Sequence, residues 1–158
     1  MKRLLLINRQ HQRKLDLRAL RQLSIHLLHS LLRQNDFQIA IHLVEHLEMT
    51  RLNETFLHHS GSTDVITFDY RTAPGRQSLE GEIFICIDEA IQQSSRFRCG
   101  WQQEVVRYLV HGVLHLMSFD DKTPPQRRVM KRHENRLLRA IVNKFPPAKL
   151  EKNPQHHA

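Results

Sequence analysis

Two histidines four residues apart, His111 and His115, are the side chains of this sequence best suited to metal chemistry. Residues at this spacing lie on one face of a helix, so both imidazoles can reach the same ion. Asp121 follows six residues after His115, just past the expected end of that helix. Its carboxylate can add a third ligand and still leave positions open for water, which a bound metal activates as a nucleophile. The segment therefore predicts a hydrolytic metal site on His111, His115 and Asp121.

Histidine spacing alone is a weak signal, because the chain contains 12 histidines. At that density roughly one pair four residues apart is expected by chance. His42 and His46 form a second pair, which we interpret as accidental. The first pair gains weight from its setting, since an apolar helix, a turn and a carboxylate follow one another at a spacing like that of metzincin sites.

The residue after the first histidine argues against a peptidase. Zinc peptidases with paired histidines carry a glutamate there, which acts as the general base for peptide hydrolysis. This chain has Gly112 at that position. The chain therefore has the ligand spacing without the peptidase base, and together with its basic character this favours phosphodiester hydrolysis.

The charge balance indicates a polyanionic partner. Lys and Arg number 24 against 16 acidic residues, which gives a net charge of +8. Nucleic acid is the first candidate and an anionic membrane surface is the second. Part of the excess falls on the last expected helix, where the candidate RNA-binding residues are Arg127, Arg128, Lys131 and Arg132. The alternative is a solvated helix face without a ligand.

The apolar pattern predicts both strands and helices. Short buried or alternating segments predict strands over residues 2–8, 37–44, 65–70 and 81–87. Helical periodicity predicts helices over residues 15–33, 49–58, 88–97, 102–117 and 124–143. Asp88 is expected to cap the third of these helices, and Thr123 with Gln126 to form a capping box on the last. Residues 72–78 are expected to form a turn or loop.

This order of elements indicates a single α+β domain over residues 1–147. We expect a mixed sheet of about four strands with packed helices, and a metal site at the end of a central helix. Residues 148–158 are expected to form a polar C-terminal tail. No apolar run reaches the ~18–20 residues of a membrane span, so we expect a cytoplasmic protein. Cys86 and Cys99 are expected to be ordinary packing thiols.

The segment HGVLHLMSFDD, residues 111–121, resembles the signature H-G-x-L-H-L-x-G-Y-D-H of the YbeY endoribonuclease family. Two further blocks follow the family order. Residues 52–56 and 63–68, the latter reading TDVITF, are similar to its Asn segment and T-D-V-L-S-F, and GEI at 81–83 is similar to G-D-I. The helix with Met130 and Glu134 also fits. Three ordered blocks are far more specific than a histidine pair.

The resemblance implies a zinc-dependent, single-strand-specific endoribonuclease that acts in 16S rRNA 3′-end maturation and ribosome quality control. It implies one Zn²⁺ per chain on His111 and His115, and rRNA with the small ribosomal subunit as partners. Asn53, Thr63 and Asp64 would lie on or near the cleft. Their equally weighted alternatives are a loop hydrogen bond for Asn53 and turn capping for the other two. No catalytic base is identified. Asp64 and Glu82 qualify only if the fold brings them near the metal.

Three positions depart from the family pattern. Asp121 replaces the third histidine ligand, which makes the metal a poorer Lewis acid and makes another divalent ion, Mn²⁺ or Mg²⁺, more plausible. Ser118 replaces a glycine, which costs about 1 kcal/mol if the position needs a positive φ. Leu57 replaces an arginine. A second interpretation therefore stays open, namely a non-catalytic RNA-binding factor for ribosome assembly with a weakened metal site.

Overall fold

The computed structural model describes residues 1–71 and 78–152, which form a four-stranded sheet packed against helices. The sheet order is β1-β2-β4-β3. β1 pairs parallel with β2, β2 pairs parallel with β4, and β3 pairs antiparallel with β4. The strand bounds are β1 Lys2–Asn8, β2 Phe37–Val44, β3 Val65–Asp69 and β4 Leu79–Cys86. The predicted α+β class with a mixed four-stranded sheet is confirmed.

Five α-helices accompany the sheet within the described residues. Their bounds are α1 Leu17–Ile25, α2 His46–Phe56, α3 Ile87–Phe97, α4 Trp101–Leu116 and α5 Pro124–Lys144. α1 runs directly into a π-helical segment, His26–Leu31, and a 3-10 turn forms at Pro147–Leu150. The single helix expected over residues 15–33 is therefore shorter and changes its hydrogen-bond pattern.

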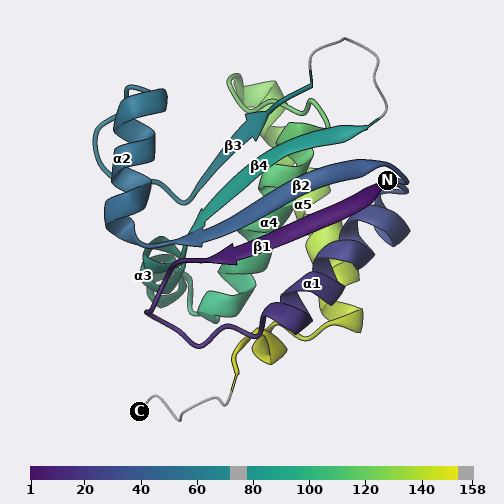
Figure 1. Cartoon of the computed structure of the whole chain (residues 1–158), viewed down its shortest axis with the longest axis horizontal. Coiled ribbons are helices and arrows are strands. Elements are labelled where there is room, and N and C mark those ends of the chain that lie inside the picture. Colours follow the sequence, from purple (N-terminus) through teal and green to yellow (C-terminus); the bar gives the residue numbers. More distant parts are fainter. Residues whose placement is uncertain (72–77, 153–158) are drawn as a thin grey trace.

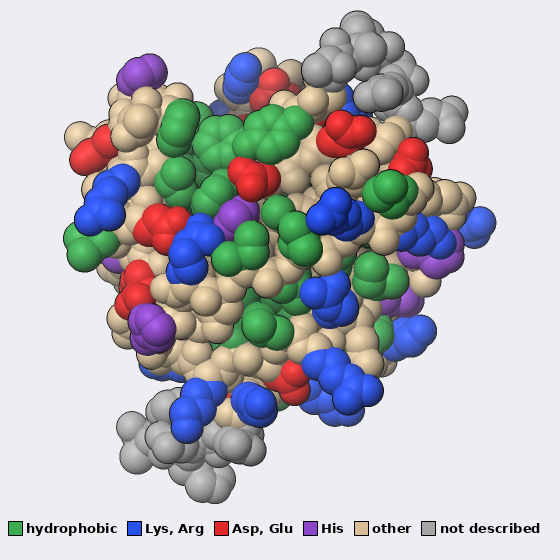
Figure 2. Space-filling view, viewed as in Figure 1, with side chains coloured by type: hydrophobic (Ala, Val, Ile, Leu, Met, Phe, Trp, Pro, Cys, Tyr) green, Lys and Arg blue, Asp and Glu red, His purple; other side chains and the backbone are tan. Residues whose placement is uncertain are grey.

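The helices are divided unequally between the two faces of the sheet. Figure 1 shows α4 and α5 behind the sheet, with α1 beside them. Most of the core lies on that side, and α4 supplies buried residues along its whole length. α2 covers part of the other face over a small cluster of Val44, Met49, Ile66, Phe84 and Cys86. In Figure 2, which looks onto this face, hydrophobic side chains gather with acidic and basic ones among them.

Gly112 lies where α4 packs against β4 and leaves no space for a side chain. A Cβ atom at this position would be 2.7 Å from Ile83 Cγ2 and 3.3 Å from Thr67 Oγ1. Both neighbours belong to sheet strands, so the glycine sets how near the helix can approach the sheet. The position has no room for the glutamate of a zinc peptidase.

One predicted helix start is confirmed and another is wrong. Thr123 accepts from the backbone of Gln126 and completes the expected capping box. Cys86, not Asp88, is the N-cap residue of α3. Asp88 lies in the first turn, where it accepts a 2.6 Å hydrogen bond from the His46 backbone and so joins α3 to α2. Its negative charge also suits a helix N-terminus.

Part of the expected C-terminal tail packs on the fold. Leu150 is buried, its carbonyl accepts from the Asp16 backbone at 2.7 Å, and Lys152 N–H donates to Lys14 at 2.8 Å. The division into a domain over 1–147 and a tail over 148–158 stays a prediction. Residues 72–77 of the expected loop and 153–158 of the tail lie outside the described residues.

Both cysteines are free thiols. Cys86 is buried, and Cys99 is partly buried. Burial raises the pKa of both thiols, which keeps them protonated and suits the packing role expected for them. Across residues 1–71 and 78–152, no helix has both the length and the apolar character needed to cross a membrane.

Candidate metal centre

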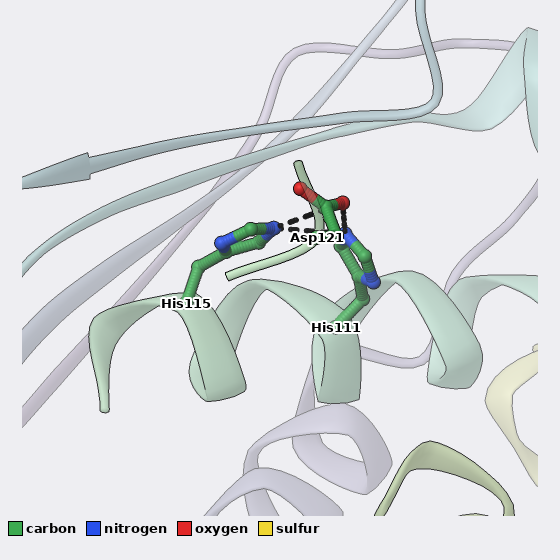
Figure 3. A group of neighbouring side chains, drawn as sticks. All are labelled: His111, His115 and Asp121. Carbon is green, nitrogen blue, oxygen red and sulfur yellow. Dashed lines mark hydrogen bonds and ion pairs between the residues drawn. The ribbon is translucent and has the colours of Figure 1, made fainter. Parts of the chain in front are cut away.

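The three predicted ligand side chains converge at the C-terminal end of α4. His111 Nε2 lies 3.0 Å from His115 Nε2 and 3.3 Å from Asp121 Oδ2, and His115 Nε2 lies 3.5 Å from the same oxygen. Figure 3 shows both imidazoles turned toward the carboxylate. A tetrahedral zinc site with bonds of about 2.0–2.1 Å requires ligand atoms about 3.3 Å apart. The three separations therefore fit one small cation held between these atoms.

A sharp turn brings Asp121 back over the helix. α4 ends at Leu116, and Phe119 N–H donates back to Leu114 at 3.0 Å. Ser118 has a φ of +74°, the left-handed conformation anticipated for the family glycine at this position. Its hydroxyl accepts a 3.1 Å hydrogen bond from Arg71, which ties the turn to the end of β3. The turn therefore keeps its geometry although serine replaces glycine.

Arg127 supports the loop that carries the third ligand. Its guanidinium donates to the carbonyls of Asp121 at 3.3 Å and Lys122 at 3.2 Å. The sequence suggested Arg127 only as an RNA contact, whereas the fold also gives it a supporting role. The other candidate RNA-binding residues of α5, Arg128, Lys131 and Arg132, are exposed.

Glu134 of α5 contacts His111, a role that the sequence did not predict. It is buried, and its Oε1 lies 2.5 Å from His111 Nδ1. Burial by itself lowers the pKa of His111, but the hydrogen bond with Glu134 and the surrounding carboxylates outweigh that effect and raise it. The sequence offered two signals, the likeness of the helix with Met130 and Glu134 to the family and the helical spacing of this acidic residue from the apolar Met130.

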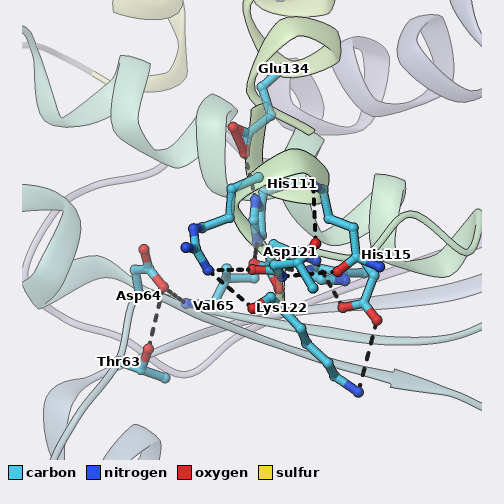
Figure 4. A network of polar contacts seen from close by, with 12 residues as sticks. Thr63, Asp64, Val65, His111, His115, Asp121, Lys122 and Glu134 are labelled. Atoms are coloured by element: carbon cyan, nitrogen blue, oxygen red, sulfur yellow. Dashed lines mark hydrogen bonds and ion pairs between the residues drawn. The ribbon is translucent and has the colours of Figure 1, made fainter. Parts of the chain in front are cut away.

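The candidate cleft residues make local contacts. Asp64 Oδ1 accepts from Val65 N–H at 2.7 Å and from the Thr63 hydroxyl at 3.3 Å, which is a capping arrangement at the start of β3 (Figure 4). Asp64 is nevertheless near enough for its charge to raise the pKa of His111. Asn53 is buried, and its amide donates to the Gly61 carbonyl at 2.9 Å. The loop and capping roles are thus present, and the cleft roles stay predictions.

Glu82 does not belong to the cluster. Its neighbour Ile83 points toward α4, so strand alternation directs Glu82 to the opposite face of the sheet. There it contacts His42 Nε2 at 3.0 Å and accepts from the Tyr70 hydroxyl at 2.8 Å. Glu82 is therefore ruled out as a general base at this site, and His42 is occupied in this separate network.

Comparison with known proteins identifies the family of the chain. The sequence profile described as "Endoribonuclease YbeY" matches residues 5–142. The chain belongs to the YbeY family. The matched residues include the cluster of His111, His115 and Asp121 at the end of α4.

Several proteins named "Endoribonuclease YbeY" are similar to this chain. The one from Salinibacter ruber is 33% identical over 110 residues, which cover 66% of this chain and 70% of that protein. The one from Chlorobium phaeovibrioides is 39% identical over 93 residues, which cover 59% and 61%. The one from Elusimicrobium minutum is 36% identical over 106 residues, which cover 66% and 74%.

A solution structure of a Thermotoga maritima protein has the same fold. It superimposes with a TM-score of 0.66 and covers 96% of this chain and 97% of the other. The two sequences are only 19% identical, so this likeness concerns the fold alone.

Proposed function

We propose that this YbeY-family protein is a cytoplasmic, metal-dependent, single-strand-specific endoribonuclease. We propose its role in 16S rRNA 3′-end maturation and ribosome quality control, with rRNA and the small ribosomal subunit as partners. The observation that carries the proposal is the convergence of His111, His115 and Asp121 in a chain whose relatives are named endoribonucleases. Three ligand atoms within 4.8 Å of one another suit a single cation.

Two imidazoles and one carboxylate are a donor set that zinc accepts, so we propose one Zn²⁺ per chain. The carboxylate also makes another divalent ion, such as Mn²⁺, a suitable occupant. When bound, the metal supplies Lewis acidity toward a phosphate oxygen and an activated water.

The side chains of this protein have distinct parts in the reaction. His111 and His115, through their Nε2 atoms, and Asp121, through Oδ2, would hold the ion. Arg127 keeps the Asp121 loop in place through its backbone carbonyls. Arg128, Lys131 and Arg132 extend a cationic face along α5, where they bind phosphates of the RNA strand and offset negative charge.

Substitution of His115 by alanine tests the proposal. The loss of one ligand should abolish RNA cleavage and metal retention, because two ligands no longer hold the ion. His115 is only partly buried, so circular dichroism should show a folded protein. His46→Ala, which removes an exposed histidine of the other pair, is the matched control and should keep full activity. Undiminished cleavage by His115→Ala protein would overturn the mechanism.

A non-catalytic RNA-binding factor for ribosome assembly is the second candidate. The observation in its favour is that Leu57, Ser118 and Asp121 all depart from the family pattern. It predicts that RNA binding survives treatment with a chelator and that no cleavage product forms. Cleavage that returns when zinc or manganese is added back would exclude it.

A further inference from the structure

Glu134 places a carboxylate where the fold would otherwise have apolar packing. The other buried residues of α5 are Met130, Leu137, Leu138 and Ile141. Removal of a carboxylate from water is costly unless a hydrogen-bonding or charged partner compensates. The partner here is His111 on α4, 23 residues away in sequence, at 2.5 Å. The buried Glu134 carboxylate is thus compensated by the Nδ1 atom of a candidate metal ligand, His111.

This contact determines which ring nitrogen of His111 faces the cluster. A neutral imidazole has one nitrogen that donates and one that accepts. A carboxylate accepts only, and the 2.5 Å contact of Nδ1 with Glu134 is shorter than the 3.3 Å contact of Nε2 with Asp121, so in the neutral ring the hydrogen lies on Nδ1. The lone pair then lies on Nε2, the atom that faces Asp121 and His115 (Figure 4). Metal ions bind that lone pair, so the hydrogen bond prepares the ring for ligation.

We propose that Glu134 is a positioning residue that fixes the tautomer and the orientation of His111 for metal binding. The inference rests on the proposed function, because it assigns Glu134 a part in the same site. The carboxylate also makes the imidazole a stronger electron donor, so it tightens metal binding from outside the ligand set. Among the described residues, no side chain is hydrogen-bonded to His115 Nδ1. A carboxylate therefore positions His111 but not His115.

The competing explanation is purely structural, with Glu134 as a polar link between α4 and α5. Under that explanation its loss lowers the free energy of unfolding but leaves the affinity of the folded protein for metal unchanged. Glu104 provides the matched control, since it is also a buried carboxylate. It lies on α4 and interacts with Cys99 at 3.3 Å and Arg107 at 4.0 Å, and within the described residues it has no hydrogen bond or ion pair with a candidate ligand.

The test is a titration of the metal-free full chain with Co²⁺, followed by visible absorption, on the wild type, Glu134→Ala, Glu134→Gln and Glu104→Gln. We expect Glu134→Ala to bind Co²⁺ about 10–100-fold more weakly, the usual effect of removing a partner of a metal-bound histidine. Glu134→Gln keeps the shape and an acceptor oxygen but not the charge, so its Co²⁺ affinity should fall between those of the wild type and Glu134→Ala. Glu104→Gln should stay within about twofold of wild type, as a site without contact to the ligands does.

Histidine nitrogen NMR adds a readout that helix packing alone does not change. At a pH well above the pKa of His111, the wild type should show this ring with its hydrogen on Nδ1, and Glu134→Ala should show mixed tautomers. Equal Co²⁺ affinity and the same tautomer in Glu134→Ala, or an equal loss of affinity in Glu104→Gln, would overturn the proposal. If Glu134→Ala does not fold, Glu134→Gln takes its place. Wild-type Co²⁺ affinity and an unchanged His111 tautomer in Glu134→Gln would then overturn the proposal.

These outcomes separate the role of Glu134 from the proposed function. Wild-type protein that binds Co²⁺ but cleaves no RNA would contradict the nuclease and leave Glu134 supported by the affinity series. Wild-type protein that binds no Co²⁺ would contradict the metal-dependent function, and an Nδ1 tautomer that is independent of Glu134 would overturn the positioning role.

Discussion

Asp121 gives the cluster a negative charge that a third imidazole would not supply. Together with Glu134 it places two carboxylates around His111, one facing each ring nitrogen. An anionic ligand lowers the net charge of a bound metal centre, so the ion polarises water and phosphate less strongly. A hard oxygen ligand also reduces the ratio of zinc affinity to manganese affinity. Asp121 is therefore the residue that we expect to decide the metal preference of the proposed site.

Replacement of Asp121 by histidine should restore a stronger preference for zinc. We expect the ratio of zinc to manganese affinity to rise on the order of tenfold, which corresponds to about 1.4 kcal/mol. Competition titrations with both metals measure it, with Asp121→Ala as the variant that lacks the third ligand and should retain neither ion well. An unchanged ratio in Asp121→His would mean that Asp121 does not set the metal preference.

Different elements hold the two ends of the segment that carries the candidate ligands. On one side Gly112 lets α4 approach β4, and on the other the turn at Ser118 returns the chain toward α5. Arg71 and Arg127 then tie the turn and the following loop to β3 and α5. The site thus depends on the packing of α4 and on the shape of its C-terminal turn.

Ser118→Gly should stabilise the protein slightly. A residue with a side chain costs about 1 kcal/mol at positive φ, and glycine removes this cost. The lost hydrogen bond to Arg71 offsets only part of the gain, because Ser118 is exposed and Arg71 keeps its contact with Asp69. Urea denaturation should show that the free energy of unfolding increases by less than about 1 kcal/mol. Ser118→Ala is the control, since it keeps the strain and loses the hydrogen bond. A less stable Ser118→Gly protein would show that the Arg71 contact dominates.

Gly112→Ala should destabilise the protein although alanine is the better helix former. The helix-propensity gain is about 1 kcal/mol, but the new Cβ meets Ile83 in a packed core, which typically costs about 1–3 kcal/mol. Thermal and urea denaturation should show a net loss of stability. In an Ile83→Ala background the clashing Cγ2 atom is absent, so the added effect of Gly112→Ala should be smaller. If the losses of stability from Gly112→Ala and Ile83→Ala simply add, a clash between residue 112 and Ile83 is not the cause.

The molecule as a whole carries an excess of positive charge. The net charge is +8, and exposed cations line α5. Proteins that bind nucleic acid through phosphate contacts release counterions, so their affinity falls steeply with salt. The proposed RNA strand would run along this face toward the end of α4.

Combined replacement of Arg128, Lys131 and Arg132 by alanine should weaken RNA binding and flatten its salt dependence. Each lost phosphate contact should reduce the slope of log affinity against log salt by about 0.7 for single-stranded RNA. Fluorescence anisotropy measures RNA affinity at several salt concentrations. The protein is kept metal-free with a chelator, so that it does not cleave the RNA. A variant that loses three exposed cations elsewhere, Lys14, Arg18 and Arg96, controls for net charge. Equal slopes in the two triple variants would mean that α5 is not the specific contact surface.

The sequence by itself determined the features that depend on neighbours along the chain. The strands at 2–8 and 37–44 are confirmed at their predicted bounds, because short apolar segments between polar residues have few alternatives. The capping box at Thr123 is equally local. The proximity of His111 and His115 follows from helical spacing within a single element. The family motif was also readable, since its blocks are short and ordered.

Only the tertiary structure decided the features that depend on contacts between elements. Glu134 meets His111 because α5 packs on α4, and no local pattern encodes a pairing across that interface. Glu82 lies on the far face because strand register fixes its direction. Asp88 joins α2 instead of capping α3, and Arg127 supports the Asp121 loop. Short-range propensities fix helices and strands, whereas the partners of charged side chains are chosen by burial and packing over the whole chain.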